Sequence, residues 1–352
     1  MDYKKEIEDL VLLLINENAS DLHLSSGRRP IIRVSGELIP LIKKNEISEQ
    51  DMRGFIDVFL SEENKRLLQQ EKDVDFSFSM TNARFRGNAY YRQGTISIAL
   101  RLIPKVIRTL DELHLPPILE TFTRKNQGFF LCVGPIGQGK TITLATMIES
   151  INQSRTEHIL TIEDPIEYVY ESKKSIIDQR EVRMDTPDFG NALISAFRQD
   201  IDVCMVGEMR DTTTISTAVT AAETGHLIFS TLHTNDAPQT LNRIIDSFPP
   251  GQQDQIRVQL AGCLTAIFSQ RLIPRISGGL IPAYELLINN NAVSNLIREK
   301  RIHEINTVIE TGMEEGMIDM NRSLVELVRA GEITVENAYM NTLNPKLLEK
   351  ML

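Results

Sequence analysis

Hydrophobic and polar residues alternate with two different periods in the first third of the chain. Four apolar residues near the start have the spacing of one helical face: Ile7, Leu10, Val11 and Leu14. They predict an amphipathic helix, and residues 49–68 also have a helical pattern. Residues 74–80 instead alternate between apolar and polar side chains, and residues 31–34 form a short apolar run, so both predict strands. The N-terminal third is therefore expected to be α+β.

Residues 84–92 predict a further strand, one face of which is basic. Successive side chains of a strand point to opposite faces, so Arg86 and Phe85 lie on different faces. Residues 96–102 predict the hairpin partner of this strand and contain Arg101. By itself, this pattern indicates no more than an exposed basic face of a sheet.

The rest of the chain has the pattern of an α/β protein. Four short apolar runs are separated by helical patterns: residues 129–133, 159–162, 203–206 and 227–229. Such runs are typical of strands buried on both faces, and their alternation with helices predicts a mostly parallel sheet. The prolines between residues 103 and 117 predict a linker. We therefore expect four regions: an N-terminal domain (1–104), a linker (105–117), an α/β core (118–291) and a helical C-terminal region (292–352).

The first of the buried runs is followed by a phosphate-binding loop. Eight consecutive residues fit the pattern G-x-x-x-x-G-K-[ST]: Gly134, Pro135, Ile136, Gly137, Gln138, Gly139, Lys140 and Thr141. A predicted strand precedes the loop and a predicted helix, residues 142–151, follows it, which is the context that this motif requires. The loop amides would bind the phosphates of ATP, Lys140 would reach the β- and γ-phosphates, and the Thr141 hydroxyl would bind Mg²⁺.

Two carboxylates follow other apolar runs. Glu163 ends residues 159–162 and Glu208 comes shortly after residues 203–206. Next to a phosphate loop, two such carboxylates can divide the work: one orders the water shell of the metal ion, and the other takes a proton from the attacking water. We interpret both as active-site residues.

His226 and His233 flank a further apolar run. Seven positions apart on one strand, the two side chains would lie on opposite faces, so a metal ion shared by both is not expected. Alone they are typical of structural or surface histidines, and a γ-phosphate sensor is the functional alternative.

The composition disfavours some classes of protein. A net charge of −10 disfavours a nucleic-acid-binding protein, because binding to nucleic acid needs a basic surface. The three cysteines are far apart in sequence, which disfavours a zinc site, and two of them lie inside apolar runs, which is typical of buried free thiols in a reducing compartment. The chain begins without the apolar core of a signal peptide, and the run 10–15 is too short to span a bilayer. A cytoplasmic protein is expected.

With these motifs assembled, the chain resembles the PilT family of secretion ATPases, the hexameric motors that retract type IV pili. Five stretches carry the resemblance. Residues 19–24 resemble the family's N-terminal signature, residues 163–167 its Asp box and residues 207–211 its atypical Walker B. Residues 224–234 resemble its His box, and residues 323–329 its C-terminal helices. The loop residues Ile136 and Gln138 depart from it, since threonine and serine are typical there. In residues 292–299, Val293 and Ser294 differ from the family's usual residues, and residues 200–202 lack the proline that is often found there.

The resemblance implies a PAS-like N-terminal domain, a RecA-like ATPase core and a homohexamer that acts on a platform protein at the inner membrane. It implies roles for the residues as well. Glu163 would be the general base, Glu208 a partner of Mg²⁺ through water, and His226 and His233 would couple the nucleotide state to movement. Arg86 and Arg101 resemble the family's arginine fingers.

Three alternatives stay open. An assembly motor of the PilB or GspE kind shares the core, although such relatives typically carry a further N-terminal domain and a four-cysteine zinc site. A nucleic-acid translocase on the same core would need a basic, aromatic binding strip, which the acidic composition disfavours. A regulatory subunit that binds ATP without turnover is disfavoured by the presence of Lys140, Glu163 and Glu208.

Overall fold

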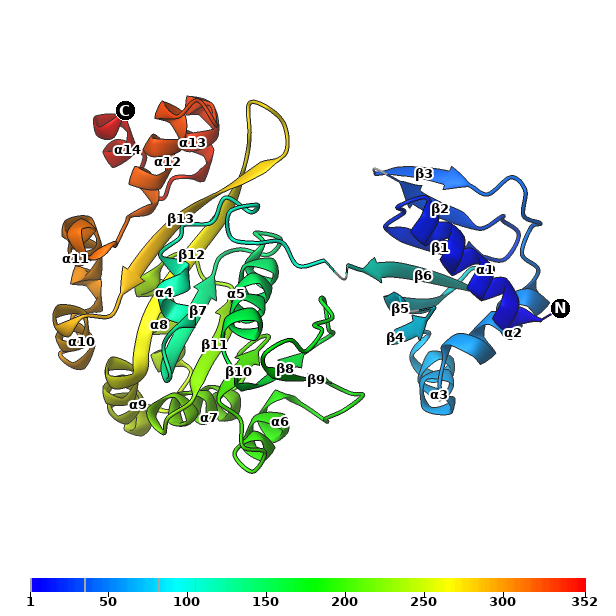
Figure 1. Cartoon of the computed structure of the whole chain (residues 1–352), viewed down its shortest axis with the longest axis horizontal. Helices are drawn as coiled ribbons and strands as arrows, with labels where there is room; N and C mark the ends of the chain where they lie inside the picture. Colours follow the sequence, from blue (N-terminus) through cyan, green and yellow to red (C-terminus); the bar gives the residue numbers. More distant parts are fainter. Residues whose placement is uncertain (1, 35, 82, 105) are drawn as a thin grey trace. The chain divides into compact units, whose positions relative to one another are not determined.

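The computed structural model describes residues 2–34, 36–81, 83–104 and 106–352, and each of its two compact units is built on one sheet (Figure 1). The first unit contains residues 1–105 and 165–169, and the second contains residues 106–164 and 170–352. Residue 105, where we expect the linker to begin, lies outside the described residues. The four predicted region boundaries stay predictions.

The N-terminal unit contains a six-stranded antiparallel sheet with the strand order β3-β2-β1-β6-β5-β4. Its elements are α1 (Tyr3–Asn16), β1 (Asp21–Ser25), β2 (Ile31–Val34), β3 (Glu37–Pro40), α2 (Glu49–Phe59), α3 (Glu62–Glu71), β4 (Asp73–Met80), β5 (Ala83–Arg92) and β6 (Thr95–Ile103).

The predicted first helix is confirmed, because all four of its apolar residues are fully buried and belong to one core with strand residues such as Leu22 and Phe85. The predicted helical segment 49–68 is two helices. Ser61 interrupts it by accepting a hydrogen bond from the Asn64 amide, which makes it the N-cap of α3.

The other face of this sheet is polar. Along β5, Phe85 and Ala89 are buried, whereas Arg86 between them is exposed, as the alternation predicts. Arg86 and Arg101 are direct cross-strand partners on β5 and β6, so their side chains lie next to each other on the polar face.

The C-terminal unit contains a seven-stranded sheet with the order β13-β12-β7-β11-β10-β8-β9, parallel except for the β12–β13 pair. Its first elements are α4 (Leu119–Thr123), β7 (Gly128–Val133), α5 (Lys140–Ser154), β8 (His158–Glu163), β9 (Ile176–Glu181), α6 (Phe189–Ala196), β10 (Val203–Val206), α7 (Thr212–Glu223) and β11 (Leu227–Leu232). They are followed by α8 (Ala237–Asp246), α9 (Pro250–Cys263), β12 (Leu264–Pro274) and β13 (Leu280–Ile288).

The four predicted parallel strands are β7, β8, β10 and β11, and every residue of β7 and β11 is buried. The chain then continues through helices α10 (Asn291–Arg298), α11 (Ile305–Thr311), α12 (Met320–Arg329), α13 (Val335–Asn341) and α14 (Pro345–Met351). In Figure 1 the orange and red helices follow the β13 side of the sheet, where Leu324 and Ala338 share a small core with Ile273 of β12 and Ile281 of β13.

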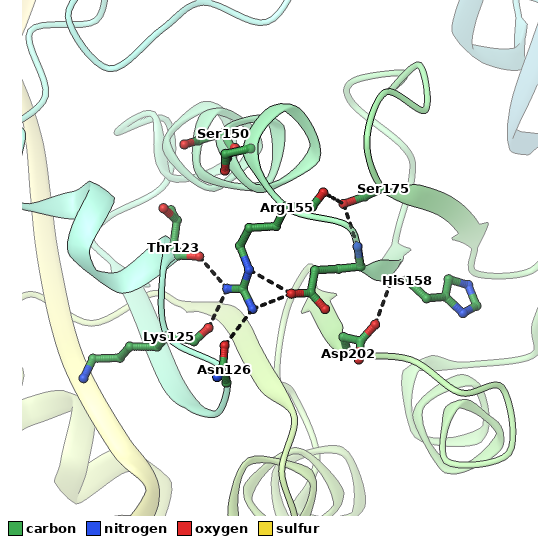
Figure 2. A network of polar contacts seen from close by, with 10 residues as sticks. Thr123, Lys125, Asn126, Ser150, Arg155, His158, Ser175 and Asp202 are labelled. Atoms are coloured by element: carbon green, nitrogen blue, oxygen red, sulfur yellow. Dashed lines mark hydrogen bonds and ion pairs between the residues drawn. The ribbon is translucent and has the colours of Figure 1, made fainter.

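One arginine joins the segments that lead into two of the parallel strands, β7 and β8. Figure 2 shows Arg155, which follows α5, donating hydrogen bonds to the carbonyl oxygens of Thr123 (2.7 Å) and Lys125 (2.6 Å) and pairing with Glu157 (2.6 Å). Close by, the His158 amide donates to Asp202 at 2.8 Å. These contacts connect the segments that lead into β7, β8 and β10.

All three cysteines are buried and free, and burial raises the pKa of each thiol to about 12. Within the part of the chain that the structure describes, no helix combines the length and apolar character needed to cross a bilayer.

Candidate active site

The predicted phosphate loop joins β7 to α5, and its glycines are required by the backbone. Gly134, Gly137 and Gly139 have φ angles of 147°, 78° and 77°, a region that favours glycine. A Cβ atom at Gly134 would also lie 2.4 Å from the Gln270 carbonyl oxygen. Helix α5 begins without a side-chain cap, so its first amide groups are available to an anion.

Lys140 connects the loop to the next strand of the sheet. Its buried ammonium group donates to the carbonyl oxygens of Gly134 (2.8 Å) and Pro135 (2.9 Å), and it lies 3.1 Å from Nδ1 of His233. An ammonium group only donates, so Nδ1 accepts and the neutral imidazole carries its proton on Nε2. Burial and then the charge of Lys140 lower the pKa of His233, which favours this neutral form.

Four strand ends carry the predicted catalytic groups. In the order β7, β11, β10, β8, neighbouring parallel strands end in the phosphate loop, His233, the segment with Glu208, and Glu163. Neighbouring strands are about 5 Å apart. The topology therefore brings Lys140, His233, Glu208 and Glu163 to one edge of the sheet.

The two carboxylates are held in different ways. Glu163 is 4% exposed, and its Oε1 accepts hydrogen bonds from the Thr161 hydroxyl (2.7 Å) and the Gln179 amide (3.1 Å). Glu208 is more exposed, pairs with Arg210 at 2.8 Å, and has its other oxygen 3.6 Å from Nε2 of His233. Glu163 thus has a fixed orientation, whereas Glu208 is accessible.

The residues present fit a nucleotide with a magnesium ion. The glycine-lined loop and the uncapped start of α5 suit phosphate oxygens. The predicted metal ligands, the Thr141 hydroxyl and the Glu208 carboxylate, are the hard oxygen donors that Mg²⁺ prefers.

The comparison with known proteins decides the family. The sequence profile described as "Type II/IV secretion system protein" matches residues 3–338. This chain belongs to that family. Within it, the chain is a member of the PilT family. It is 45% identical over 317 residues to the twitching motility protein of Neisseria gonorrhoeae, which covers 90% of this chain and 84% of that protein.

Further relatives agree with this placement. Over 334 residues the chain is 40% identical to the type IV pilus retraction ATPase PilT of Pseudomonas aeruginosa, covering 95% of this chain and 97% of that protein. The crystal structure of the pilus retraction motor PilT with bound ADP has 43% sequence identity and a TM-score of 0.91, and it covers 98% of this chain and 99% of that one. The fold is thus the predicted one, with an N-terminal domain and a RecA-like ATPase domain.

The structure does not bring every predicted residue of this PilT-family chain to the strand ends. His226 lies at the amino end of β11, roughly 20 Å along the strand from His233. Its Nδ1 is 3.1 Å from the Ala221 carbonyl oxygen, and its ring packs edge-on against Phe197. In its own unit, His226 is therefore remote from the phosphate loop.

Arg86 and Arg101 belong to the N-terminal unit. Arg86 is exposed, and the side chain of Arg101 is 72% exposed with Nε donating to Asp21 at 2.9 Å. Both guanidinium groups are accessible, as an arginine finger requires, and their role stays a prediction.

Sequence reasoning missed Gln270. This buried side chain on β12 donates to the Gln138 carbonyl oxygen (2.8 Å) and accepts from the Thr143 hydroxyl (2.7 Å), while the Gln138 side chain accepts from the Leu272 amide (2.7 Å). Two of these hydrogen bonds fix the loop to β12, and the third fixes the first turn of α5 to the same strand. Its sequence context gave little signal, because Gln270 stands between the polar residues Ser269 and Arg271.

Proposed function

We propose that this chain is an ATP-hydrolysing motor that powers the retraction of type IV pili. The observation that carries the proposal is the row of Lys140, His233, Glu208 and Glu163 along one edge of the sheet, in a chain whose relatives are named as pilus retraction ATPases. The same relatives favour retraction over assembly by a PilB-like or GspE-like motor.

In this proposal, each residue has a chemical task. The loop amides, the start of α5 and Lys140 bind the phosphates of ATP, and Glu163 takes the proton of the attacking water in the orientation that Thr161 and Gln179 impose. Thr141 and Glu208 would hold Mg²⁺, which offsets phosphate charge when bound. His233 contacts both Lys140 and Glu208, so it is placed to respond to the γ-phosphate.

The finer parts of the proposal concern the assembly. The chain would form a homohexamer in which Arg86 and Arg101 stabilise charge on the phosphates, and His226 would act in movement rather than in chemistry. Hydrolysis would shift the two domains as rigid bodies and do work on a platform protein, with the ring docked on the cytoplasmic side of the inner membrane.

Replacing the general base tests the chemistry. Glu163→Gln keeps the size of the side chain but removes its basicity, so we expect turnover to fall by about 100-fold or more while ATP still binds. Glu310→Gln, an exposed position on α11, is the matched control. The wild-type chain and the two variants are compared by phosphate release and by equilibrium binding of a non-hydrolysable ATP analogue. Equal turnover of all three would exclude Glu163 as the base.

Deleting the gene in its pilus-forming host tests the direction of the motor. Loss of a retraction motor is expected to leave the cells with excess pili, and restoring the wild-type chain but not Glu163→Gln should reverse this. Cells without pili would indicate an assembly motor instead.

A further inference from the structure

A small cavity lies on the polar face of the N-terminal sheet, beside β1 and β2, and the ATPase proposal does not use it. Its volume is about 180 Å³, and its polar lining comes from His23, Ser25, Arg28, Arg29, Arg33 and Tyr90. Among the described residues, this lining holds three arginines and no carboxylate. In a chain with a net charge of −10, such a local excess of positive charge indicates an anion site.

Two of the arginines are held in place by backbone oxygens. Arg29 donates to the Ile42 carbonyl oxygen and Arg33 to that of Gly36, each at 2.7 Å. Each contact uses one of the five N–H groups of a guanidinium, so most of the donors are left for another partner.

The carboxylate of Asp21, which faces Arg33, does not neutralise the cavity. Its Oδ1 accepts from Arg101 at 2.9 Å, and its Oδ2 lies 3.7 Å from Arg33, so one negative charge is shared between two arginines. Arg28 is exposed and adds a further positive charge at the rim.

Two buried polar atoms at this place lack a hydrogen-bond partner within the described part of the chain: Nε2 of His23 and Oγ of Ser97. Ser97 is 1% exposed and is the cross-strand partner of both Ser25 and Tyr90, so its side chain lies on the cavity side of the sheet between them. Buried polar groups are nearly always paired, and a ligand in the cavity would supply the missing partners.

We propose that this cavity binds the phosphate group of a small phosphate ester. Planar guanidinium forks match phosphate oxygens, and three of them converge here with an imidazole and two hydroxyl-bearing side chains. The remaining lining, Ile31, Leu38 and the ring of Tyr90, offers an apolar surface to the organic part of the ligand. All residues that line this cavity belong to the N-terminal unit, whereas the phosphate loop belongs to the other unit.

The same geometry makes binding dependent on pH. Burial lowers the pKa of His23; Arg33 and Arg101 lower it further, while Asp21 opposes them. His23 is therefore mostly neutral at pH 7, and a bound anion would raise its pKa, so binding takes up a proton. Tyr90, Arg28 and Arg29 also line the cavity. Sulfate, which does not titrate in this range, should bind more tightly at pH 6, and His23→Gln should remove the difference.

A charge-matched pair of double variants tests the site. Pyrophosphate is titrated by calorimetry into the full chain, in the wild-type background and in a Lys140→Ala background that weakens the phosphate loop. We expect Arg28→Gln with Arg29→Gln to weaken binding at least tenfold. Arg53→Gln with Arg66→Gln, exposed positions on α2 and α3, should have no effect. Equal affinities of both double variants would overturn the proposal, and thermal unfolding would show that each chain is folded.

The source of the phosphate is tested separately. If the ligand is a lipid headgroup, vesicles that contain phosphatidylglycerol should bind the wild-type chain better than phosphatidylcholine vesicles do, and the Arg28/Arg29 double variant should lose this preference. If the ligand is a free ester, the Arg28/Arg29 double variant should lose affinity for pyrophosphate, whereas neither chain should distinguish the two kinds of vesicle. Binding of neither probe would exclude a phosphate site. Unchanged ATP turnover in the double variant would keep this result distinct from the ATPase proposal.

Discussion

At the scale of single residues, the site is a row of polar contacts that starts in the phosphate loop. Lys140 donates to His233, and the far nitrogen of His233 faces Glu208, so three strands of the sheet contribute to one contact path. Because Nδ1 accepts from an ammonium group, protonation of His233 would break this contact. The lowered pKa of His233 keeps it intact at neutral pH.

Gln270 is the residue through which the other side of the loop is positioned. Gln270→Leu removes one hydrogen bond to the loop and one to Thr143 of α5, and it is expected to weaken ATP binding by roughly tenfold, since a lost buried hydrogen bond costs about 1–3 kcal/mol. The turnover number should change less than the affinity, because Gln270 contacts the loop and not the strand ends with Glu163 and Glu208. Gln255→Leu, exposed on α9, is the control. A loss of turnover at unchanged affinity would contradict the positioning role.

Glu285 on β13 makes stability depend on pH. Burial, helped by Asp236 and Asp319, raises its pKa to about 7 from a model-peptide value of 4.5. The folded state thus favours the protonated form, and this stabilisation is complete below about pH 4.5 and is lost as the pH rises through 7. Glu285→Gln should therefore raise the free energy of unfolding at pH 8 by at most about 3 kcal/mol, and with it the thermal midpoint. At pH 5 the same substitution should change neither. Glu336→Gln, exposed on α13, should be neutral at both.

At the scale of elements, the parallel strands have two edges with different tasks. The carboxyl ends hold the predicted catalytic groups, whereas the amino ends are joined by the network around Arg155 (Figure 2). β11 spans both edges, with His233 at one end and His226 at the other. This division explains why the two histidines have different surroundings.

Removing Arg155 should destabilise the fold without touching the nucleotide site. Its side chain is 15% exposed, and Arg155→Met would leave Glu157 and two carbonyl oxygens unpaired, at a cost of about 2–4 kcal/mol. The thermal midpoint is expected to drop by several degrees. Arg124→Met, whose 76% exposed side chain pairs with Glu120, should shift it little. Equal midpoints for the two variants would show that the network is not stabilising.

The sequence predicted those elements whose burial leaves a strong pattern. β7, β8, β10 and β11 are recognisable as apolar runs, and the row of site residues follows once their ends are placed side by side. β3 went unrecognised because all four of its residues are exposed and carry no alternation. Gln270 could not be assigned to the site because its contact with Gln138 joins positions 132 residues apart, a pairing that only the folded sheet reveals.

At the scale of the whole molecule, the proposed chemistry needs residues from both units. The phosphate loop belongs to the second unit, and Arg86 and Arg101 belong to the first. These two arginines are neighbours with like charge on β5 and β6. Asp21 offsets part of their repulsion by accepting from Arg101, and a further anion would relieve the rest.

Arg86→Ala tests whether the first unit takes part in hydrolysis. Arg86 is exposed, so the fold should survive, and turnover is expected to fall about 1,000-fold if the side chain acts as an arginine finger. Nucleotide affinity and the mass in solution, measured by light scattering, should stay those of the wild-type chain. Arg53→Ala controls for loss of charge in the same unit. Full turnover by Arg86→Ala, or by a chain that stays monomeric with nucleotide, would argue against a ring with shared sites.

The burial of all three cysteines has a practical consequence for observing the motor at work. Thiols with a pKa of about 12 are almost entirely protonated at neutral pH and react slowly with maleimides and methanethiosulfonates. A cysteine introduced at an exposed site of each unit, such as Arg53 and Glu310, would therefore be labelled selectively in an otherwise native chain. Pairs of spin labels or fluorophores at these sites would report whether the distance between the two units changes during turnover, as the proposed rigid-body shift requires.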